Sequence, residues 1–342
     1  MEIDKIFRFG IDKVKLFGFD MKTEKKWKIQ STENEDDYIE KTVINDELFS
    51  IVSTYRLKSC GDTYEEIISN HIEFNPNRIL SGNNVRNATT ADLQEAVDIL
   101  TEILAKKEVY VDFSDAKIKE IEFNVNLPVD FESYKRVFQL FIFQFREPKF
   151  IGRFIKKEKE SEYRSDETYF TKINKKSSFL IYDKSKESDY PKEVTRMEYQ
   201  FSYDTYRYNV NLYGLTNSLE DLLRHPEIPE KLFVDRAKKD FLQKAFQFLE
   251  ENIKPILERE YLNFKKNNRF YKLNGRPQRR NVYKYLNQYN IFDYSFLIDL
   301  VQKHDAPHMQ REKERIIRKY GHLNNVEKLN RVMNFLLPIA TT

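Results

Sequence analysis

The segment at residues 118–127, IKEIEFNVNL, predicts a β-strand whose two faces differ in chemistry. Successive side chains of a strand point to opposite sides, so residues two apart share a face. The apolar row is Ile121, Phe123, Val125 and Leu127, and the polar row is Glu122, Asn124 and Asn126. A strand of this kind is typical of an antiparallel sheet that buries one face and leaves the other polar.

Five more segments alternate in the same way and extend the predicted sheet. They are residues 11–20 (IDKVKLFGFD), 48–57 (LFSIVSTYRL), 71–76 (HIEFNP), 177–184 (SSFLIYDK) and 194–203 (VTRMEYQFSY). Helical spacing occurs at residues 91–107, behind a Thr90 cap, and in the aromatic segment 131–145. The order β-β-β-α-β-α-β-β predicts an α+β fold, in which helices pack on one face of an antiparallel sheet.

The periodicity changes near residue 218, after which the sequence reads as a series of helices separated by Gly, Asn and Pro. We therefore expect two domains, residues 1–218 built around the sheet and residues 219–342 built from helices. In the second domain Pro255 is expected to kink or end a helix, because proline cannot donate a backbone hydrogen bond.

Composition narrows the possible functions. The chain has 342 residues, with 58 Lys and Arg against 55 Asp and Glu, so a nucleic-acid site must come from local clustering of basic residues. The single cysteine, Cys60, excludes an internal disulfide, and no Cys and His spacing fits a structural zinc site. No apolar run reaches about 18 residues, so a cytoplasmic protein is expected. Without a P-loop or Rossmann motif, the sequence supports neither ATPase nor helicase activity.

Three predicted strands each carry one carboxylate on the polar face, namely Glu73, Glu122 and Glu198. If these strands are neighbours, the carboxylates form an acidic patch that a divalent cation would stabilise. His71 lies two residues before Glu73, about 6.5 Å away at Cα, so both side chains could bind the same ion. The alternative is a polar sheet face that is simply hydrated, which is common in antiparallel sheets.

The segment Tyr182-Asp183-Lys184 is the main candidate for covalent chemistry. A phenol can attack a DNA phosphate and form a phosphotyrosyl link when a base or a metal helps to remove its proton. Lys184, on the same strand face, would stabilise negative charge on the phosphate or the phenolate. Because the chain has 21 tyrosines, a packed aromatic is the alternative for each, and Tyr203 and Tyr206 are rival nucleophiles.

Four segments taken together resemble the rolling-circle replication initiators of the phage gene II/X and plasmid type, which are related to the Rep_trans initiators and relaxases. The segments are IDKVKLFGFD (11–20), HIEFNPNRILSGNNVRNATTADLQEAV (71–97), KEIEFNVNLPVDFESYKRVFQL (119–140) and TYFTKINKKSSFLIYDKSKESDYPKEVTRMEYQF (168–201). The resemblance implies an HUH-like nickase domain. It also implies a metal-dependent enzyme that nicks one DNA strand at an origin, stays on the new 5′ end through a tyrosine, and rejoins strands.

The resemblance also implies roles for individual residues. Tyr182 is the preferred nucleophile, with Lys184 as its cationic neighbour, and Glu122 and Glu198 fall where such proteins place acidic residues on strands. Arg196 falls where a basic residue often precedes the second acid, and would contact phosphate. Tyr182 would attack an unpaired origin strand, since a stacked duplex presents its phosphates poorly to a tyrosine on a sheet.

The metal motif departs from the pattern of the wider class. Many relatives have two histidines around a hydrophobic residue, whereas this chain has His71-Ile72-Glu73. The predicted ligands are His71, Glu73, Glu122 and Glu198. The expected cofactor is Mg²⁺ or Mn²⁺, because these ions prefer oxygen ligands.

Under this resemblance the C-terminal region recognises duplex DNA. Residues 264–286 concentrate basic side chains among aromatic ones, a composition that suits contact with phosphates. The predicted DNA-binding residues there are Lys265, Lys266, Arg269, Arg276, Arg279 and Arg280. A host helicase stays open as a further partner. Two other functions also stay open: a relaxase of a mobile element, and a non-catalytic origin-binding protein or repressor.

Overall fold

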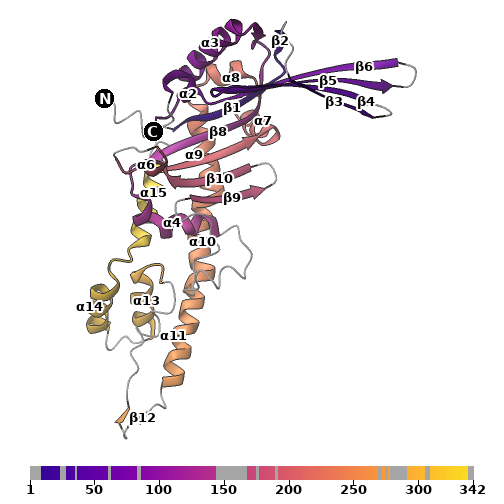
Figure 1. Cartoon of the computed structure of the whole chain (residues 1–342). Coiled ribbons are helices and arrows are strands. Elements are labelled where there is room, and N and C mark those ends of the chain that lie inside the picture. The colour runs from indigo at the N-terminus through magenta and orange to yellow at the C-terminus, as the bar shows by residue number, and fades with distance from the viewer. Residues whose placement is uncertain are drawn as a thin grey trace. The chain divides into compact units, whose positions relative to one another are not determined.

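The computed structural model describes residues 9–23, 28–34, 37–60, 63–82, 86–143, 168–174, 177–188, 192–268, 272–273, 276–277, 291–304 and 309–337. The chain divides into two compact units (Figure 1). Unit 1 comprises Met1–Pro128 and Lys172–Asp235, and unit 2 comprises Val129–Thr171 and Arg236–Thr342. The assignment of separate functions to residues 1–218 and 219–342 stays a prediction.

A nine-stranded sheet has the strand order β3-β4-β5-β6-β1-β8-β11-β10-β9 (Figure 1). Its strands are β1 (Phe9–Phe17), β3 (Lys28–Asn34), β4 (Asp37–Asn45), β5 (Phe49–Cys60), β6 (Thr63–Phe74), β8 (Lys117–Leu127), β9 (Thr168–Asn174), β10 (Ser177–Asp183) and β11 (Thr195–Ser202). Every pairing whose register is described is antiparallel. The antiparallel sheet with its helices and the helical C-terminal region confirm the predicted α+β fold class.

Two short sheets complete the strands, β2 (Asp20–Thr23) with β7 (Val109–Asp112), and β12 (Lys272–Leu273) with β13 (Arg276–Pro277). The helices are α2 (Pro76–Ser81), α3 (Thr90–Lys106), α4 (Phe131–Phe143), α6 (Lys184–Glu187), α7 (Tyr203–Asn211), α8 (Leu219–Arg224), α9 (Ile228–Ala237), α10 (Gln243–Phe248), α11 (Lys254–Asn268), α13 (Tyr294–His304), α14 (Met309–Tyr320) and α15 (Asn325–Leu336).

Local sequence explains where the helices begin. The side chains of Thr89 and Asp92 each accept a hydrogen bond from the other residue's backbone N–H, which caps α3 one residue earlier than predicted. Of the two outcomes expected at Pro255, the end of a helix is wrong, since α11 continues to Asn268, and the kink stays a prediction. Proline is tolerated there because it closely follows a π-helical segment, Leu249–Ile253, where the spacing of the backbone hydrogen bonds already changes.

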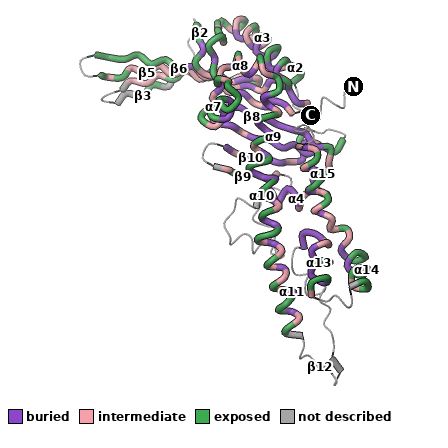
Figure 2. Tube along the Cα trace, turned by 180° about the vertical axis from the view of Figure 1, so that it is seen from behind, coloured by how far each residue is buried: buried purple, intermediate pink, exposed green. Residues whose placement is uncertain are grey.

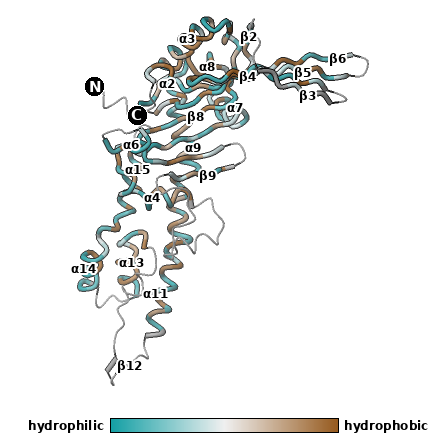
Figure 3. The backbone as a smooth tube through the Cα atoms, in the orientation of Figure 1, coloured by the Kyte–Doolittle hydropathy of each residue, from teal (hydrophilic) through white to brown (hydrophobic). Residues whose placement is uncertain are grey.

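The core of unit 1 lies on the apolar face of the sheet. Phe123 of β8 packs against Phe201 of β11 and Tyr206 of α7, with ring centroids 5.4 and 6.3 Å apart. Helix α7 therefore covers this face. Figure 2 shows the buried residues concentrated in the central strands, whereas the outer half of β6 is exposed. Along the strands, hydrophobic and hydrophilic residues alternate (Figure 3), as the period of two predicts.

Strands β3 and β4 were not expected, because their sequences, KIQSTEN and DYIEKTVIN, are largely polar. Strand β3 pairs with β4, and β4 pairs with β5. These backbone hydrogen bonds between strands hold β3 and β4 in the sheet, and the residue pattern of a single strand cannot reveal them.

Gly10 allows residues 87–88 to approach β1 closely. The N–H of Ile11 donates to the carbonyl oxygen of Ala88 at 2.9 Å. A Cβ atom at position 10 would lie 2.5 Å from the Cβ of Asn87 and 2.9 Å from the Ala88 oxygen.

We expect Gly10→Ala to lower the free energy of unfolding by about 1–3 kcal/mol, because the added methyl group must displace the backbone at residues 87–88. Urea denaturation checks this expectation. An unchanged denaturation midpoint would show that the segment moves without cost.

Candidate metal and nucleophile site

Three neighbouring strands bring the predicted site residues to one face of the sheet. In the β8–β11 register Glu198 lies opposite Asn124, and in the β10–β11 register Tyr182 lies opposite Arg196. Glu122 is two residues from Asn124 on the same row of β8. The structure therefore brings together Glu122, Glu198, Arg196 and Tyr182, as the strand patterns predict.

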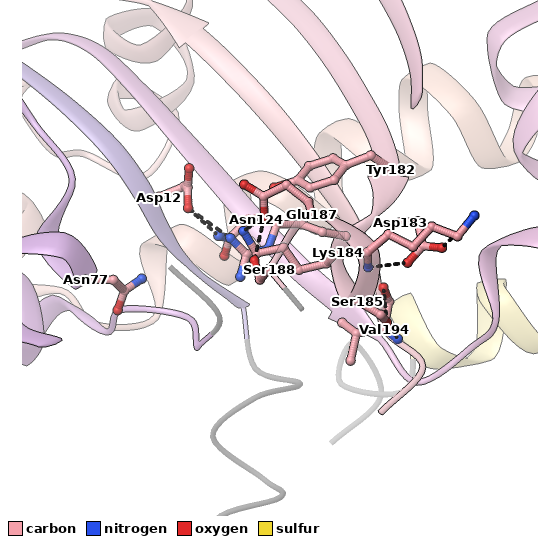
Figure 4. A network of polar contacts seen from close by, with 12 residues as sticks. Asp12, Asn77, Asn124, Tyr182, Asp183, Lys184, Ser185, Glu187, Ser188 and Val194 are labelled. Carbon is pink, nitrogen blue, oxygen red and sulfur yellow. Dashed lines mark hydrogen bonds and ion pairs between the residues drawn. The ribbon is translucent and has the colours of Figure 1, made fainter. Parts of the chain in front are cut away.

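Asp12 completes this group, and the sequence analysis missed it. Strict alternation would place Asp12 in the same row as Val14 and Leu16, which are fully buried core residues. A β-bulge between β1 and β8 interrupts the pairing at this point, because Ile11 pairs with Phe123 and Lys13 with Glu122, which leaves Asp12 as an extra residue. The bulge turns Asp12 toward the polar face (Figure 4).

Asp12, Glu122 and Glu198 form a cluster of three carboxylates, which we call the acidic triad. One oxygen from each lies within 4.8 Å of the others. Burial and the nearby Glu198 raise the pKa of Glu122 to about 8. Burial and the nearby Asp12 raise the pKa of Glu198 to about 7. Both carboxyl groups thus retain protons that a cation would displace.

The donor set of the acidic triad fits a hard divalent cation. All three groups offer carboxylate oxygens, the ligands that Mg²⁺ and Mn²⁺ prefer. Asn124 adds a fourth candidate oxygen. Its side-chain nitrogen donates to Asp12 Oδ1 at 3.3 Å, while its buried Oδ1 has no hydrogen-bond partner within the described residues. A buried acceptor without a donor is costly unless something else binds it.

Arg196 supplies the positive charge already built into the site. Its fully buried guanidinium donates to Asp12 Oδ1 at 3.0 Å and to Asn126 Oδ1 at 2.8 Å. A further bond at 3.3 Å reaches Asn87 Oδ1 in the segment next to Gly10. These contacts bind Arg196 to protein groups, so the geometry favours charge balance and orientation of Asp12 over the predicted direct contact with phosphate.

Tyr182 is coupled directly to the acidic triad. Its hydroxyl donates to Glu198 Oε1 at 2.7 Å, and its side chain is half-buried. Burial and the charge of Glu198 raise the pKa of Tyr182 well above its usual range. The phenol is therefore neutral at rest and requires a base to become a nucleophile, and the hydrogen-bonded carboxylate is in position to be that base.

Lys184 is less available to stabilise charge on a phosphate or a phenolate than the sequence suggested. It follows the end of β10, its side chain is fully buried, and its Nζ forms an ion pair with Glu187 Oε2 at 2.5 Å (Figure 4). The same nitrogen lies 5.6 Å from the centre of the Tyr182 ring. Lys184 thus adjoins the candidate nucleophile, as the spacing predicts, but its charge is matched within the protein.

His71 and Glu73 lie outside the acidic triad. Glu73 is held between two ammonium groups, with Oε1 2.5 Å from Lys13 Nζ and Oε2 3.2 Å from Lys15 Nζ. His71 Nε2 is 3.0 Å from the hydroxyl of Ser69 and 3.2 Å from Lys119 Nζ. Positive charge next to both residues opposes cation binding, so the geometry favours Asp12 and Asn124 as ligands in their place.

The predicted DNA-binding residues are only partly described. Lys265 and Lys266 lie in the last turn of α11, where Lys265 Nζ donates to the backbone oxygen of His304 at 3.0 Å. Arg276 lies in β13. Arg269, Arg279 and Arg280 fall outside the described residues. The role of this basic stretch in DNA binding stays a prediction.

Comparisons with known proteins leave the family open. No family model and no curated protein matches this chain. A rolling circle replication initiator protein from Geobacillus stearothermophilus aligns with a TM-score of 0.26 and 9% identity over 58% of this chain and 76% of that one. The di-domain ARO/CYC BexL from the BE-7585A biosynthetic pathway aligns with a TM-score of 0.21 and 10% identity over 73% of this chain and 90% of that one. At such scores neither likeness supports an argument about fold or function.

Among the described helices, none has the length and apolar character needed to cross a membrane.

We expect the stability of the metal-free protein to fall as the pH rises from about 4.5 to 8. The ordinary pKa of Glu is 4.5, so in this range the unfolded chain is ionised while folded Glu122 and Glu198 retain protons. Mn²⁺ should raise the melting temperature more at pH 8 than at pH 6, because fewer protons then compete. Thermal denaturation with and without Mn²⁺ measures both effects.

Glu122→Gln should flatten the pH dependence and remove most of the Mn²⁺ effect. Glu120→Gln is the matched control, since Glu120 lies on the same strand outside the acidic triad and its bond from Gln200 survives the change. Equal Mn²⁺ stabilisation in both variants would contradict a metal site at the acidic triad.

Arg196→Met should lower the free energy of unfolding by about 3–5 kcal/mol, because it leaves Asp12 as an uncompensated buried charge. Arg207→Met, at an exposed position of α7, should cost less than about 0.5 kcal/mol. Urea denaturation of the two variants at pH 8 compares them, and similar losses would argue against Arg196 as the counter-ion of the site.

Proposed function

We propose that this chain is a metal-dependent DNA nickase and strand transferase that initiates rolling-circle replication through Tyr182. The proposal rests above all on the hydrogen bond from the Tyr182 hydroxyl to Glu198, a member of the acidic triad. A tyrosine, a base of raised pKa and a set of oxygen ligands on one sheet face are the groups that phosphotyrosyl chemistry needs. The resemblance of the four sequence segments to rolling-circle initiators supports DNA as the substrate.

In the first step Tyr182 transfers its phenolic proton to Glu198 and its oxygen attacks the phosphorus of one DNA phosphate. The bond between phosphorus and the 3′ oxygen breaks, the leaving oxygen takes a proton from solvent, and a free 3′ hydroxyl and a 5′-phosphotyrosyl ester remain. Glu198 is placed for this role because its Oε1 already accepts the hydrogen bond of the Tyr182 hydroxyl at 2.7 Å. In the rejoining step a 3′ hydroxyl gives its proton to solvent and attacks the ester, the bond between phosphorus and the tyrosine oxygen breaks, and the phenolate recovers its proton from Glu198.

The other residues orient this pair. Asp12, Glu122 and Glu198 would hold a divalent cation, with Asn124 as a further ligand, and the ion would polarise the scissile phosphate. Arg196 fixes Asp12, and Lys184 with its partner Glu187 anchors the chain where β10 ends beside Tyr182. The substrate is an unpaired strand, because a partly buried tyrosine on a sheet reaches a flexible single strand more easily than a stacked duplex.

A covalent-capture experiment tests the proposal. The protein is incubated with Mn²⁺ and a single-stranded DNA library that has fixed flanks and a random centre, and is then denatured. We expect protein-linked DNA that survives denaturation and maps to the tryptic peptide at residues 177–184, in which Tyr182 is the only tyrosine. Tyr182→Phe should reduce the adduct at least a thousandfold, since the nucleophile is lost.

Tyr203→Phe and Tyr206→Phe are the controls. Tyr206 lies on the apolar face against Phe123, and Tyr203 packs edge-on against Phe17, so neither belongs to the acidic triad. Both variants should keep the adduct. Loss of the adduct in Tyr203→Phe alone would move the nucleophile while preserving the enzyme class. DNA binding without any adduct would favour the non-catalytic origin-binding protein or repressor.

A further inference from the structure

A second β-bulge in the β1–β8 pair creates a basic cluster on the same sheet face. Lys15 pairs with Glu120 and Leu16 with Ile118, which leaves Lys119 as the extra residue. Strict alternation would place Lys119 in the row of the buried residues Ile121 and Phe123, and the bulge turns it to the polar side instead. The bulge at Asp12 thus adds a carboxylate to one part of this face, and the bulge at Lys119 adds an ammonium group to another.

Lys119 lies against His71 of β6. Its Nζ is 3.2 Å from Nε2 and 3.4 Å from Nδ1 of the imidazole. An ammonium group can only donate, so the nitrogen that receives its hydrogen bond must be unprotonated. Burial, together with the charges of Lys119 and Lys15, lowers the pKa of His71. Burial and Lys15 also lower the pKa of Lys119, although Glu120 acts in the opposite direction.

The acidic side chains near this cluster are already occupied. Glu73 is bonded to both Lys13 and Lys15, and Glu120 accepts a hydrogen bond from Gln200 at 2.6 Å. The lysine charges that lower the pKa of His71 and the pKa of Lys119 indicate positive potential at these two side chains. The Lys15 side chain is 32% exposed, so a bound anion could reach it from solvent.

We propose that Lys15, Lys119 and His71 form a phosphate-binding subsite that holds the DNA backbone next to the scissile phosphate. The subsite rests on the proposed function for the identity of its ligand. It lies on the same face of β8 as Glu122, three residues and roughly 10 Å away along the strand. A bound phosphate accepts hydrogen bonds from both ammonium groups, and protonated His71 adds a third donor.

The subsite answers a mechanical need of the proposed reaction. A single strand is flexible, so in-line attack requires a second fixed point that sets the direction of the backbone at the reacting phosphate. Once ionised, the carboxylates of the acidic triad would repel DNA unless a cation offset their charge, and a basic cluster beside them draws the strand across the sheet face. His71 and Glu73 therefore act in anion binding and charge balance, where the sequence suggested a metal.

The test measures binding of a fluorescent single-stranded oligo(dT) by anisotropy at several NaCl concentrations. It uses Tyr182→Phe protein in EDTA, so that neither cleavage nor metal contributes. Each phosphate contact on single-stranded DNA contributes about 0.7 to the slope of log affinity against log salt. The double substitution Lys15→Gln and Lys119→Gln should lower the affinity about tenfold and reduce this slope by about 0.7–1.4.

The control is the double substitution Lys22→Gln and Lys106→Gln, which removes the same charge at exposed positions of β2 and α3. It should leave both affinity and slope nearly unchanged. Equal losses in the two double variants would overturn the subsite, since only total charge would then matter. Melting curves verify folding, and Glu73 keeps its 2.5 Å ion pair with Lys13 after the Lys15 substitution, so little loss of stability is expected.

A second measurement reads the subsite directly in the unsubstituted lysine background. The imidazole resonances of His71 are assigned by comparison with His71→Gln and followed during titration with oligo(dT). They should move toward the protonated form as phosphate binds, and unchanged resonances at saturation would refute the subsite. The outcome is separable from the nickase proposal, because oligo(dT) binding is measured here without the Tyr182 hydroxyl and without metal. An adduct from the unsubstituted protein together with unchanged His71 resonances would overturn the subsite alone, and oligo(dT) binding at the subsite without an adduct would overturn the nickase alone.

Discussion

The buried ion pair between Asp12 and Arg196 is the interaction on which the candidate site depends. A carboxylate removed from water needs a compensating charge, and Arg196 supplies it at 3.0 Å from β11, which lies on the other side of β8 from β1. The same guanidinium also bonds Asn126 and Asn87. The Arg196 side chain therefore connects β1 and β8 to the segment at residues 87–88, which Gly10 allows to lie close to β1. It also holds Asp12 close to the two glutamates of the acidic triad.

The single positive charge of Arg196 cannot neutralise all three carboxylates of the acidic triad. Glu122 and Glu198 have raised pKa values, and the buried Oδ1 of Asn124 lacks a partner within the described residues. A divalent cation would neutralise the two glutamates, because it replaces their protons. It would also bind the neutral oxygen of Asn124. This incomplete neutralisation distinguishes the site from a hydrated sheet face, where carboxylates would keep their ordinary pKa values. Tyr182 is bonded to one of these same carboxylates, which couples the nucleophile to the protonation and metal state of the site.

The polar face of the sheet carries opposite charges in two neighbouring regions. The acidic triad lies over β1, β8 and β11, and the cluster of Lys15, Lys119 and His71 lies over β1, β8 and β6. A bulge in the β1–β8 pair provides a member of each. Bulges often redirect side chains next to functional sites. Here they give two strands of one pair both a candidate metal ligand and a candidate phosphate ligand.

The sequence by itself determined the central strands β1, β5, β8, β10 and β11 and the inner end of β6. It also determined the sheet face of each side chain within an unbroken run, and the candidates Glu122, Glu198, Tyr182 and Arg196. Period-two alternation is a local property of an extended backbone, so it can be read without knowing the partners of a strand. Only the tertiary structure decided that Asp12 joins these residues and that His71 and Glu73 lie among lysines. A bulge arises from the pairing of two strands, and a single inserted residue reverses every assignment on one side of it. The electrostatic surroundings of His71 likewise come from β1 and β8, which are distant in sequence and adjacent only after the sheet has formed.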